Sequence, residues 1–148
     1  MAAKDDSAFA PGTPEVEIDR IDGMPVHVDG ERGRMGDVVL TNDRILYGQK
    51  FGPTGNLIGD LVASGLEERS AKKAGGPRVA ARLADVRGGR LERRRLLPDL
   101  YALTLEDGSR CRTHRKVRKQ WDETIRRLLT ERHGLPVFDD GEGGWRVG

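Results

Sequence analysis

The sequence predicts an α+β protein with about seven antiparallel strands, an extra helix between the third and fourth strands, and a helix after the last strand. Three observations support this prediction. Short segments in both halves of the chain alternate apolar and polar residues, as half-buried strands do. Turn-forming residues such as Asp107-Gly108 separate these segments and favour antiparallel hairpins. Two longer segments, 54–74 and 115–133, instead repeat apolar residues at helical spacing.

The first three strands are expected in the N-terminal half. Val26 and Val28 alternate with polar neighbours, and a glycine-containing turn follows. A second apolar segment runs up to Thr41-Asn42-Asp43, which has the composition of a tight turn. The apolar residues after this turn form the returning strand. The three strands are predicted over 24–28, 37–40 and 45–51.

The segment 54–74 is predicted to form the inserted helix, which a Gly-Gly-Pro sequence ends. Its apolar residues form one stripe. This stripe packs either against the protein's own sheet or against the same helix of a second copy. The residues expected at such an interface are Leu57, Ile58, Leu61 and Val62.

Four further strands are expected before the last helix. Alternation is clear around Tyr101 and Leu103, whereas Gly88-Gly89 interrupts an earlier segment. In the last strand Cys111 is expected to face the core and the arginines beside it to face outward. These strands are predicted over 78–83, 86–91, 101–105 and 109–113, with a charged loop over 92–99.

The segment 115–133 is predicted to be the closing helix. Val117, Trp121 and Ile125 belong to one apolar stripe, which the helix must bury against the sheet. Trp121 is the side chain expected to fill the centre of the core. The main core positions are expected at Tyr47, Leu103, Trp121 and Ile125.

These elements place one domain at 24–134 between two tails. Residues 1–23 are acidic and lack a hydrophobic period, and residues 135–148 are rich in glycine and aspartate, so both are expected to be flexible. The length of 148 residues suits one domain, and the single cysteine excludes a disulfide scaffold. No run approaches the roughly 20 apolar residues of a membrane span, and no signal peptide is evident. A cytoplasmic location is expected, and a peripheral position at the membrane stays open.

The net charge of +2 conceals a strong polarity along the chain. Residues 1–31 carry two basic and eight acidic side chains, a net charge of −6. Residues 76–119 carry thirteen basic and five acidic side chains, a net charge of +8, and eleven of the thirteen are arginine. Arginine holds phosphate or carboxylate through two parallel hydrogen bonds. The basic segment is either a surface for an anionic partner or a solvated face without a partner.

Three sequence motifs follow one another along the chain. They are GDVVLTNDRILY at 36–47, ARLADV at 81–86, and LTLEDG at 103–108 ahead of the Trp121 helix. In order and spacing they resemble the pleckstrin-homology-like (PH-like) superfold, and most closely GRAM and bacterial PH-type domains, over about residues 24–133. The resemblance implies a PH-like split β-barrel capped by the C-terminal helix, with the 54–74 helix as an insert found in some bacterial relatives. It also implies a binding module for lipid headgroups, proteins or peptides, without a catalytic centre.

The arginine-rich segment supplies the candidate binding site. The expected function is that of a non-enzymatic adaptor whose partner is an anionic membrane lipid or an acidic protein surface. The alternative is a protein–protein or self-assembly module that forms a homo-oligomer through the 54–74 helix. The candidate anion-binding residues are Arg87, Arg90, Arg93, Arg94, Arg95, Arg110, Arg112, Arg115 and Lys116.

The sequence offers no motif for catalysis, metal binding or cofactor binding. Its three histidines have no paired spacing, Cys111 has no second cysteine nearby, and there is no glycine-rich phosphate loop. We therefore expect no enzymatic activity, no cofactor and no metal. The composition also argues against a nucleic-acid partner, because Tyr101 is the one aromatic residue of the basic segment and its alternation places it in the core.

Overall fold

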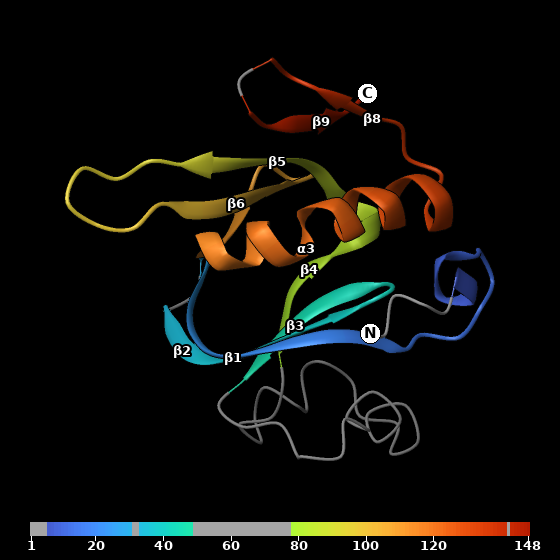
Figure 1. The fold of residues 1–148 in the computed structure, drawn as a ribbon, viewed down its shortest axis with the longest axis horizontal. Helices are drawn as coiled ribbons and strands as arrows, with labels where there is room; N and C mark the ends of the chain where they lie inside the picture. The colour runs from blue at the N-terminus through green and yellow to red at the C-terminus, as the bar shows by residue number, and fades with distance from the viewer. Residues whose placement is uncertain (1–5, 31–32, 49–77, 142) are drawn as a thin grey trace.

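The computed structural model describes residues 6–30, 33–48, 78–141 and 143–148. Within these ranges the fold is α+β, as predicted: one antiparallel sheet of nine strands and one α-helix, α3 (Arg115–Arg127). The sheet bends round this helix, with β1, β2 and β3 on one side of it and β5 and β6 on the other (Figure 1). The strand order is β4-β3-β2-β1-β7-β6-β5-β9-β8. The strands are β1 (Glu17–Val28), β2 (Arg34–Thr41), β3 (Arg44–Gly48), β4 (Arg78–Arg82), β5 (Val86–Glu92), β6 (Leu100–Leu105), β7 (Arg110–His114), β8 (Val137–Asp139) and β9 (Trp145–Val147).

Seven of these strands overlap the seven predicted segments, and two do not. The additional strands, β8 and β9, come from the C-terminal segment that the sequence pattern indicates as a tail. Each has only three residues, too few for an alternation of apolar and polar residues to be recognised. The predicted helix over 54–74 lies outside the described residues. Its expected interface residues Leu57, Ile58, Leu61 and Val62 lie outside them as well.

The ordered domain begins earlier than the sequence pattern indicates, because β1 starts at Glu17 rather than near Met24. The first half of β1 lacks a strict alternation of apolar and polar residues, because its pairing with β2 shifts register twice. Gly23 lies at the second shift with a φ of 58°, in the left-handed region that favours glycine. The bent strand pairs with β2 along most of its length and with β7 through Val26–Val28.

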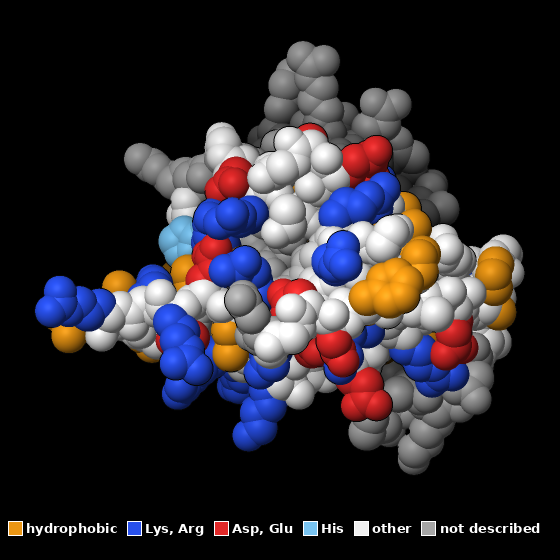
Figure 2. Space-filling view, turned by 90° about the horizontal axis from the view of Figure 1, so that it is seen from above, with side chains coloured by type: hydrophobic (Ala, Val, Ile, Leu, Met, Phe, Trp, Pro, Cys, Tyr) orange, Lys and Arg blue, Asp and Glu red, His pale blue; other side chains and the backbone are white. Residues whose placement is uncertain are grey.

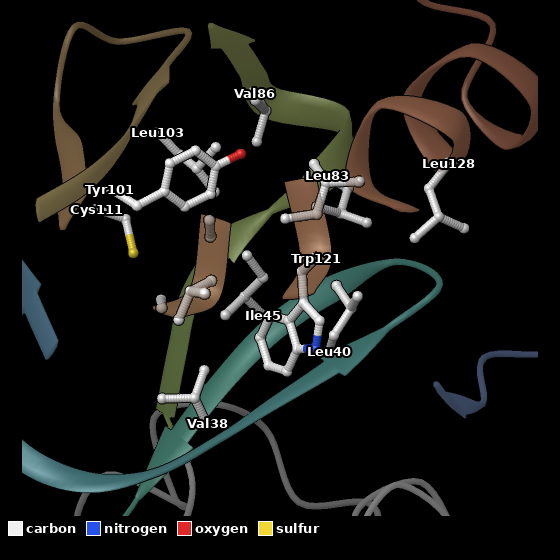
Figure 3. Packing of buried hydrophobic residues seen from close by; sticks show 14 of the residues in the cluster. Val38, Leu40, Ile45, Leu83, Val86, Tyr101, Leu103, Cys111, Trp121 and Leu128 are labelled. Atoms are coloured by element: carbon white, nitrogen blue, oxygen red, sulfur yellow. The ribbon is translucent and has the colours of Figure 1, made fainter. Parts of the chain in front are cut away.

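The C-terminal helix covers the core as predicted. Nδ1 of His114 accepts a hydrogen bond from the Lys116 N–H at 3.1 Å where α3 begins, and a π-helical turn, η4 (Leu128–Arg132), continues the helix. Trp121 is 1% exposed and lies among the buried side chains of the core (Figure 3), with its Nε1 donating to Asp19 Oδ2 at 2.8 Å. None of the described helices is long and apolar enough to cross a membrane. The other predicted core residues, Tyr47, Leu103, Cys111 and Ile125, are also buried.

The segment before β1, which the sequence indicates as a tail, is joined to the fold by the β2–β3 turn. A short 3-10 helix, η2 (Asp6–Phe9), buries Phe9 in the core. The buried Asn42 donates to two carbonyl oxygens of this segment, at 3.0 and 3.1 Å, and its Oδ1 accepts from the Val16 N–H at 2.9 Å. The turn predicted from Thr41-Asn42-Asp43 thus also anchors the N-terminal segment.

Arg132 makes a second connection to the N-terminal segment. Its side chain is 8% exposed and forms a two-pronged ion pair with Asp43, at 2.7 and 3.1 Å. The same guanidinium donates to the carbonyl oxygen of Ala10 and to the hydroxyl and carbonyl oxygens of Thr13, at 2.6–2.8 Å. Five hydrogen bonds from one side chain therefore link η4, the β2–β3 turn and the N-terminal segment.

The C-terminal hairpin extends the sheet beyond β5. β9 pairs with β5 at Gly88 and Gly89, so this glycine pair forms part of the strand that it is predicted to interrupt. A Cβ atom on Gly89 would lie 2.5 Å from Cζ2 of the buried Trp145, which is closer than side-chain atoms pack. The contact joins residues more than fifty positions apart, and a local sequence pattern does not reveal it.

Candidate functional site

Five of the predicted anion-binding residues lie at one end of the sheet. Glu92, the last residue of β5, pairs with Leu100, the first of β6, and Leu100 pairs with His114, the last of β7. The β5–β6 loop (93–99) and the first turn of α3 therefore leave the sheet side by side. This set, which we name the cationic end, consists of Arg93, Arg94, Arg95, Arg115 and Lys116.

The charges of the cationic end are not offset within the described structure. Four of its side chains, all but Arg94, are exposed and make no ion pair with any residue in the described ranges. Arg94 is half-buried, and its Nε donates to the Pro98 carbonyl oxygen at 2.9 Å, which leaves its charge unpaired. Asp99 is the one acidic residue of the loop. A net positive field therefore extends from this end of the sheet.

Arg110 and Arg112 lie instead in a neutral network on the outer face of the sheet. Glu92 accepts from Arg112 Nε at 2.6 Å and from Arg110 Nη1 at 2.9 Å, and Asp29 accepts from Arg112 Nη1 at 2.7 Å. The hydrogen bond from Arg112, followed by that from the Arg110 backbone, holds the pKa of Asp29 below its usual range. Two cations and two carboxylates offset each other, so this network has no net charge.

Arg87 and Arg90 occupy separate positions on β5. Arg87 donates to two nearby carbonyl oxygens, at 2.9 and 3.0 Å, and its Nη2 lies 3.5 Å from Glu106. Arg90 is exposed and flanks Ala102 on the side opposite Arg112. The nine predicted residues thus divide into five at the cationic end, three that form ion pairs with Glu106, Glu92 or Asp29, and Arg90, which is exposed on β5.

The β5–β6 loop also carries two leucines that the sequence interpretation leaves out. Leu96 is 92% exposed and Leu97 is 60% exposed. The β5–β6 hairpin projects beyond the body of the protein (Figure 1), and hydrophobic and cationic side chains lie together at the far end of the projection (Figure 2). The run RRRLLP at 93–98 is the sequence signal. It places two large apolar residues in a loop where no strand or helix period requires them.

A cavity of about 330 Å³ lies between α3 and the C-terminal hairpin. In its wall Asp122 Oδ1 accepts from the Tyr101 hydroxyl at 2.6 Å and from Trp145 Nε1 at 2.8 Å. Arg126 Nε lies 3.1 Å from Asp122 Oδ2 as an ion pair without forming a hydrogen bond, and Arg118 donates to the Gly143 carbonyl oxygen. Burial and the neighbouring carboxylate raise the pKa of Tyr101 well above its usual value. These groups are hydrogen-bonded or ion-paired with one another, and their contacts hold the C-terminal hairpin against α3.

Cys111, His114 and His133 have structural roles. Burial raises the pKa of the Cys111 thiol to about 12, so at neutral pH it is a protonated packing group. His114 caps α3, and His133 Nε2 lies 3.1 Å from the Asn42 carbonyl oxygen. Across the described ranges, no three His, Cys, Asp or Glu side chains are grouped in a way that would hold a metal ion.

The chemistry of the cationic end follows from its own side chains. It combines positive charge that has no described acidic partner with exposed apolar surface at the tip of the adjoining loop. In comparison with known proteins, no family model matches the chain, and no curated protein or solved structure matches it.

Proposed function

We propose that this protein is a non-enzymatic binding module that docks on an anionic surface through its cationic end. The observation that supports the proposal is the gathering of five basic residues where the β5–β6 loop and α3 leave the sheet. Four of these five side chains are exposed and have no ion pair within the described ranges, whereas Arg87, Arg110 and Arg112 pair with Glu106, Glu92 and Asp29. This separation of paired and unpaired arginines favours a binding surface over a face that is merely solvated.

The proposal includes a PH-like architecture. The sheet order supports it, because β1 joins the strands β2–β4 on one side to β7, β6 and β5 on the other, and α3 lies in the curl of the sheet. The Asp29 N–H donates to the Arg110 carbonyl oxygen at 3.0 Å, so the β1–β2 and β6–β7 turns share one end. The cationic end is the opposite one, where the helix begins.

The size of the electrostatic contribution can be estimated. A basic residue close to an anionic bilayer contributes about 1 kcal/mol. Arg93, Arg94 and Arg95 together then contribute about 3 kcal/mol, which corresponds to roughly a hundredfold in affinity. Salt screens such interactions beyond about 8 Å at physiological ionic strength. Binding through this end should therefore weaken as salt is added.

The test compares the protein with a charge-reversed variant on two anionic probes. The probes are immobilised polyglutamate and vesicles of equal parts phosphatidylcholine and phosphatidylglycerol. The variant Arg93→Glu/Arg94→Glu/Arg95→Glu should bind both at least a hundredfold more weakly, with an unchanged circular dichroism spectrum. For a matched control, Arg95→Glu is compared with Arg146→Glu, which makes the same charge change at an exposed position of β9. The proposal is overturned if the native protein binds neither probe at low salt, or if the triple variant binds as well as the native protein.

A further inference from the structure

The tip of the β5–β6 loop exposes apolar side chains, and binding to an anionic surface through charge alone does not require them. Leu96 and Leu97 are neighbours in sequence and both are largely exposed at the end of a projection. Single exposed leucines are common on protein surfaces, but two adjacent ones in a projecting loop favour contact with an apolar partner. The adjoining arginines restrict that partner to one that is also anionic.

Charge and apolar surface follow a definite order along the loop. The hydrogen bond from Arg94 Nε to the Pro98 carbonyl oxygen closes the loop beneath residues 95–97, so Arg95 and the two leucines lie at its apex. Arg93 precedes this closure, Arg95 lies inside it beside the leucines, and the basic residues of the first turn of α3 lie behind it at the end of the sheet. Because the loop is closed by this bond, less conformational entropy is lost when the tip is held in a contact.

We propose that the partner of the cationic end is an anionic lipid bilayer, and that Leu96 and Leu97 enter the boundary between its headgroups and acyl chains. This inference rests on the proposed function and names its partner. A bilayer presents phosphate first and hydrocarbon beneath it, so it can receive both the basic and the apolar side chains of this tip. Insertion stays shallow, since the backbone N–H and C=O groups of the tip need water or headgroup partners.

An acidic protein surface fits the tip less well. A stable protein–protein interface buries about 800 Å² on each partner. The loop 93–99 offers two exposed leucines, and two side chains are too small to supply such an area. A fluid bilayer admits such a tip without a pre-formed pocket of matching shape, so the geometry favours the membrane.

The main test removes the leucines and leaves the charge unchanged. Leu96→Ser/Leu97→Ser should bind equal-part phosphatidylcholine–phosphatidylglycerol vesicles at least about tenfold more weakly at physiological salt, because two apolar side chains no longer leave water. Its binding to immobilised polyglutamate should not change. Met35→Ser is the matched control, since Met35 is 62% exposed on β2, and it should bind both probes as the native protein does. The substituted side chains are exposed, so the variants should keep the native thermal transition.

A second measurement reports insertion directly. The variant Leu97→Trp is titrated with the same vesicles, in which the phosphatidylcholine carries brominated acyl chains that quench indole fluorescence on contact. Trp121 and Trp145 are buried and give a background that the lipid does not reach. Fluorescence of the new indole should be quenched and shifted to the blue. The same substitution combined with Arg93→Glu/Arg94→Glu/Arg95→Glu should show neither change.

The outcomes separate the two proposals. If the serine variant binds vesicles as tightly as the native protein and the new indole is not quenched, insertion is refuted while docking on an anionic surface stands. If the native protein binds polyglutamate but not vesicles, the partner is an acidic protein surface and the membrane is refuted. If it binds neither probe, the proposed function fails as well.

Discussion

The substitution Arg132→Met tests how the N-terminal segment is held to the domain. It keeps much of the length of the side chain but removes all five hydrogen bonds to Asp43, Ala10 and Thr13. Breaking a buried ion pair costs about 3–5 kcal/mol. Asp43 is 33% exposed and can regain water, and the carbonyl oxygens at the edge of the segment can also be hydrated. We therefore expect the free energy of unfolding to fall by about 2–3 kcal/mol.

Urea unfolding followed by circular dichroism measures this loss. Hydrogen exchange adds a local readout, because the Asn42 N–H donates to the Val16 carbonyl oxygen at 3.2 Å and should exchange faster once the segment is released. Arg115→Met is the control: this arginine is exposed at the start of α3, and its replacement should change stability by less than about 0.5 kcal/mol. A loss below about 1 kcal/mol for Arg132→Met, or unchanged exchange at Asn42, would show that the clamp does not hold the segment.

Three further predictions follow from the buried contacts and the ion network. Gly89→Ala should destabilise the protein by about 1–3 kcal/mol and alter the near-UV signal of Trp145, because the new methyl group overlaps the indole; urea unfolding and near-UV circular dichroism measure this. Cys111 should resist a disulfide reagent such as Ellman's reagent at pH 8 until urea unfolds the chain, since burial raises its pKa to about 12, and rapid labelling of the native protein would contradict this assignment. The lowered pKa of Asp29 means that its ionised form stabilises the fold at neutral pH and that this contribution is lost as the pH falls through that pKa. Acid unfolding of Asp29→Asn should therefore show a shallower fall in stability with pH than the native protein, and parallel curves would show that the bond from Arg112 contributes nothing.

The elements that the sequence predicts correctly are those with a regular local pattern. Alternation around Tyr101 and Leu103 gives β6, and the stripe of Trp121 and Ile125 gives α3 and the centre of the core. The elements that it misses are held by distant contacts. The first half of β1 has an irregular register, and β9 is ordered by Trp145 against a strand that lies far away in the sequence. A periodic pattern contains no information about such contacts.

The sequence predicts which arginines are candidates for the site, but not how these arginines are arranged or which of them are paired. Charge alone singles out the arginines, but their partners are set by the pairing of β5, β6 and β7, which brings Glu92 beside Arg110 and Arg112. The separation of a neutral network from a cationic end is therefore a property of the fold. Leu96 and Leu97 do not stand out in the sequence because a periodic pattern covers strands and helices and not loops, and their exposure is seen only in the structure.

The double pairing of β1 has a consequence for the order in which the chain folds. β1 and β2 are close in sequence and can form a hairpin early, whereas Val26–Val28 pair with β7 residues that follow more than eighty positions later. Closing so long a loop is entropically costly and comes late. Until β7 has left the ribosome, the C-terminal end of β1 is an open strand edge next to the buried Val26 side chain. A chain that stalls before Cys111 would therefore expose a surface prone to pair with other unfinished chains.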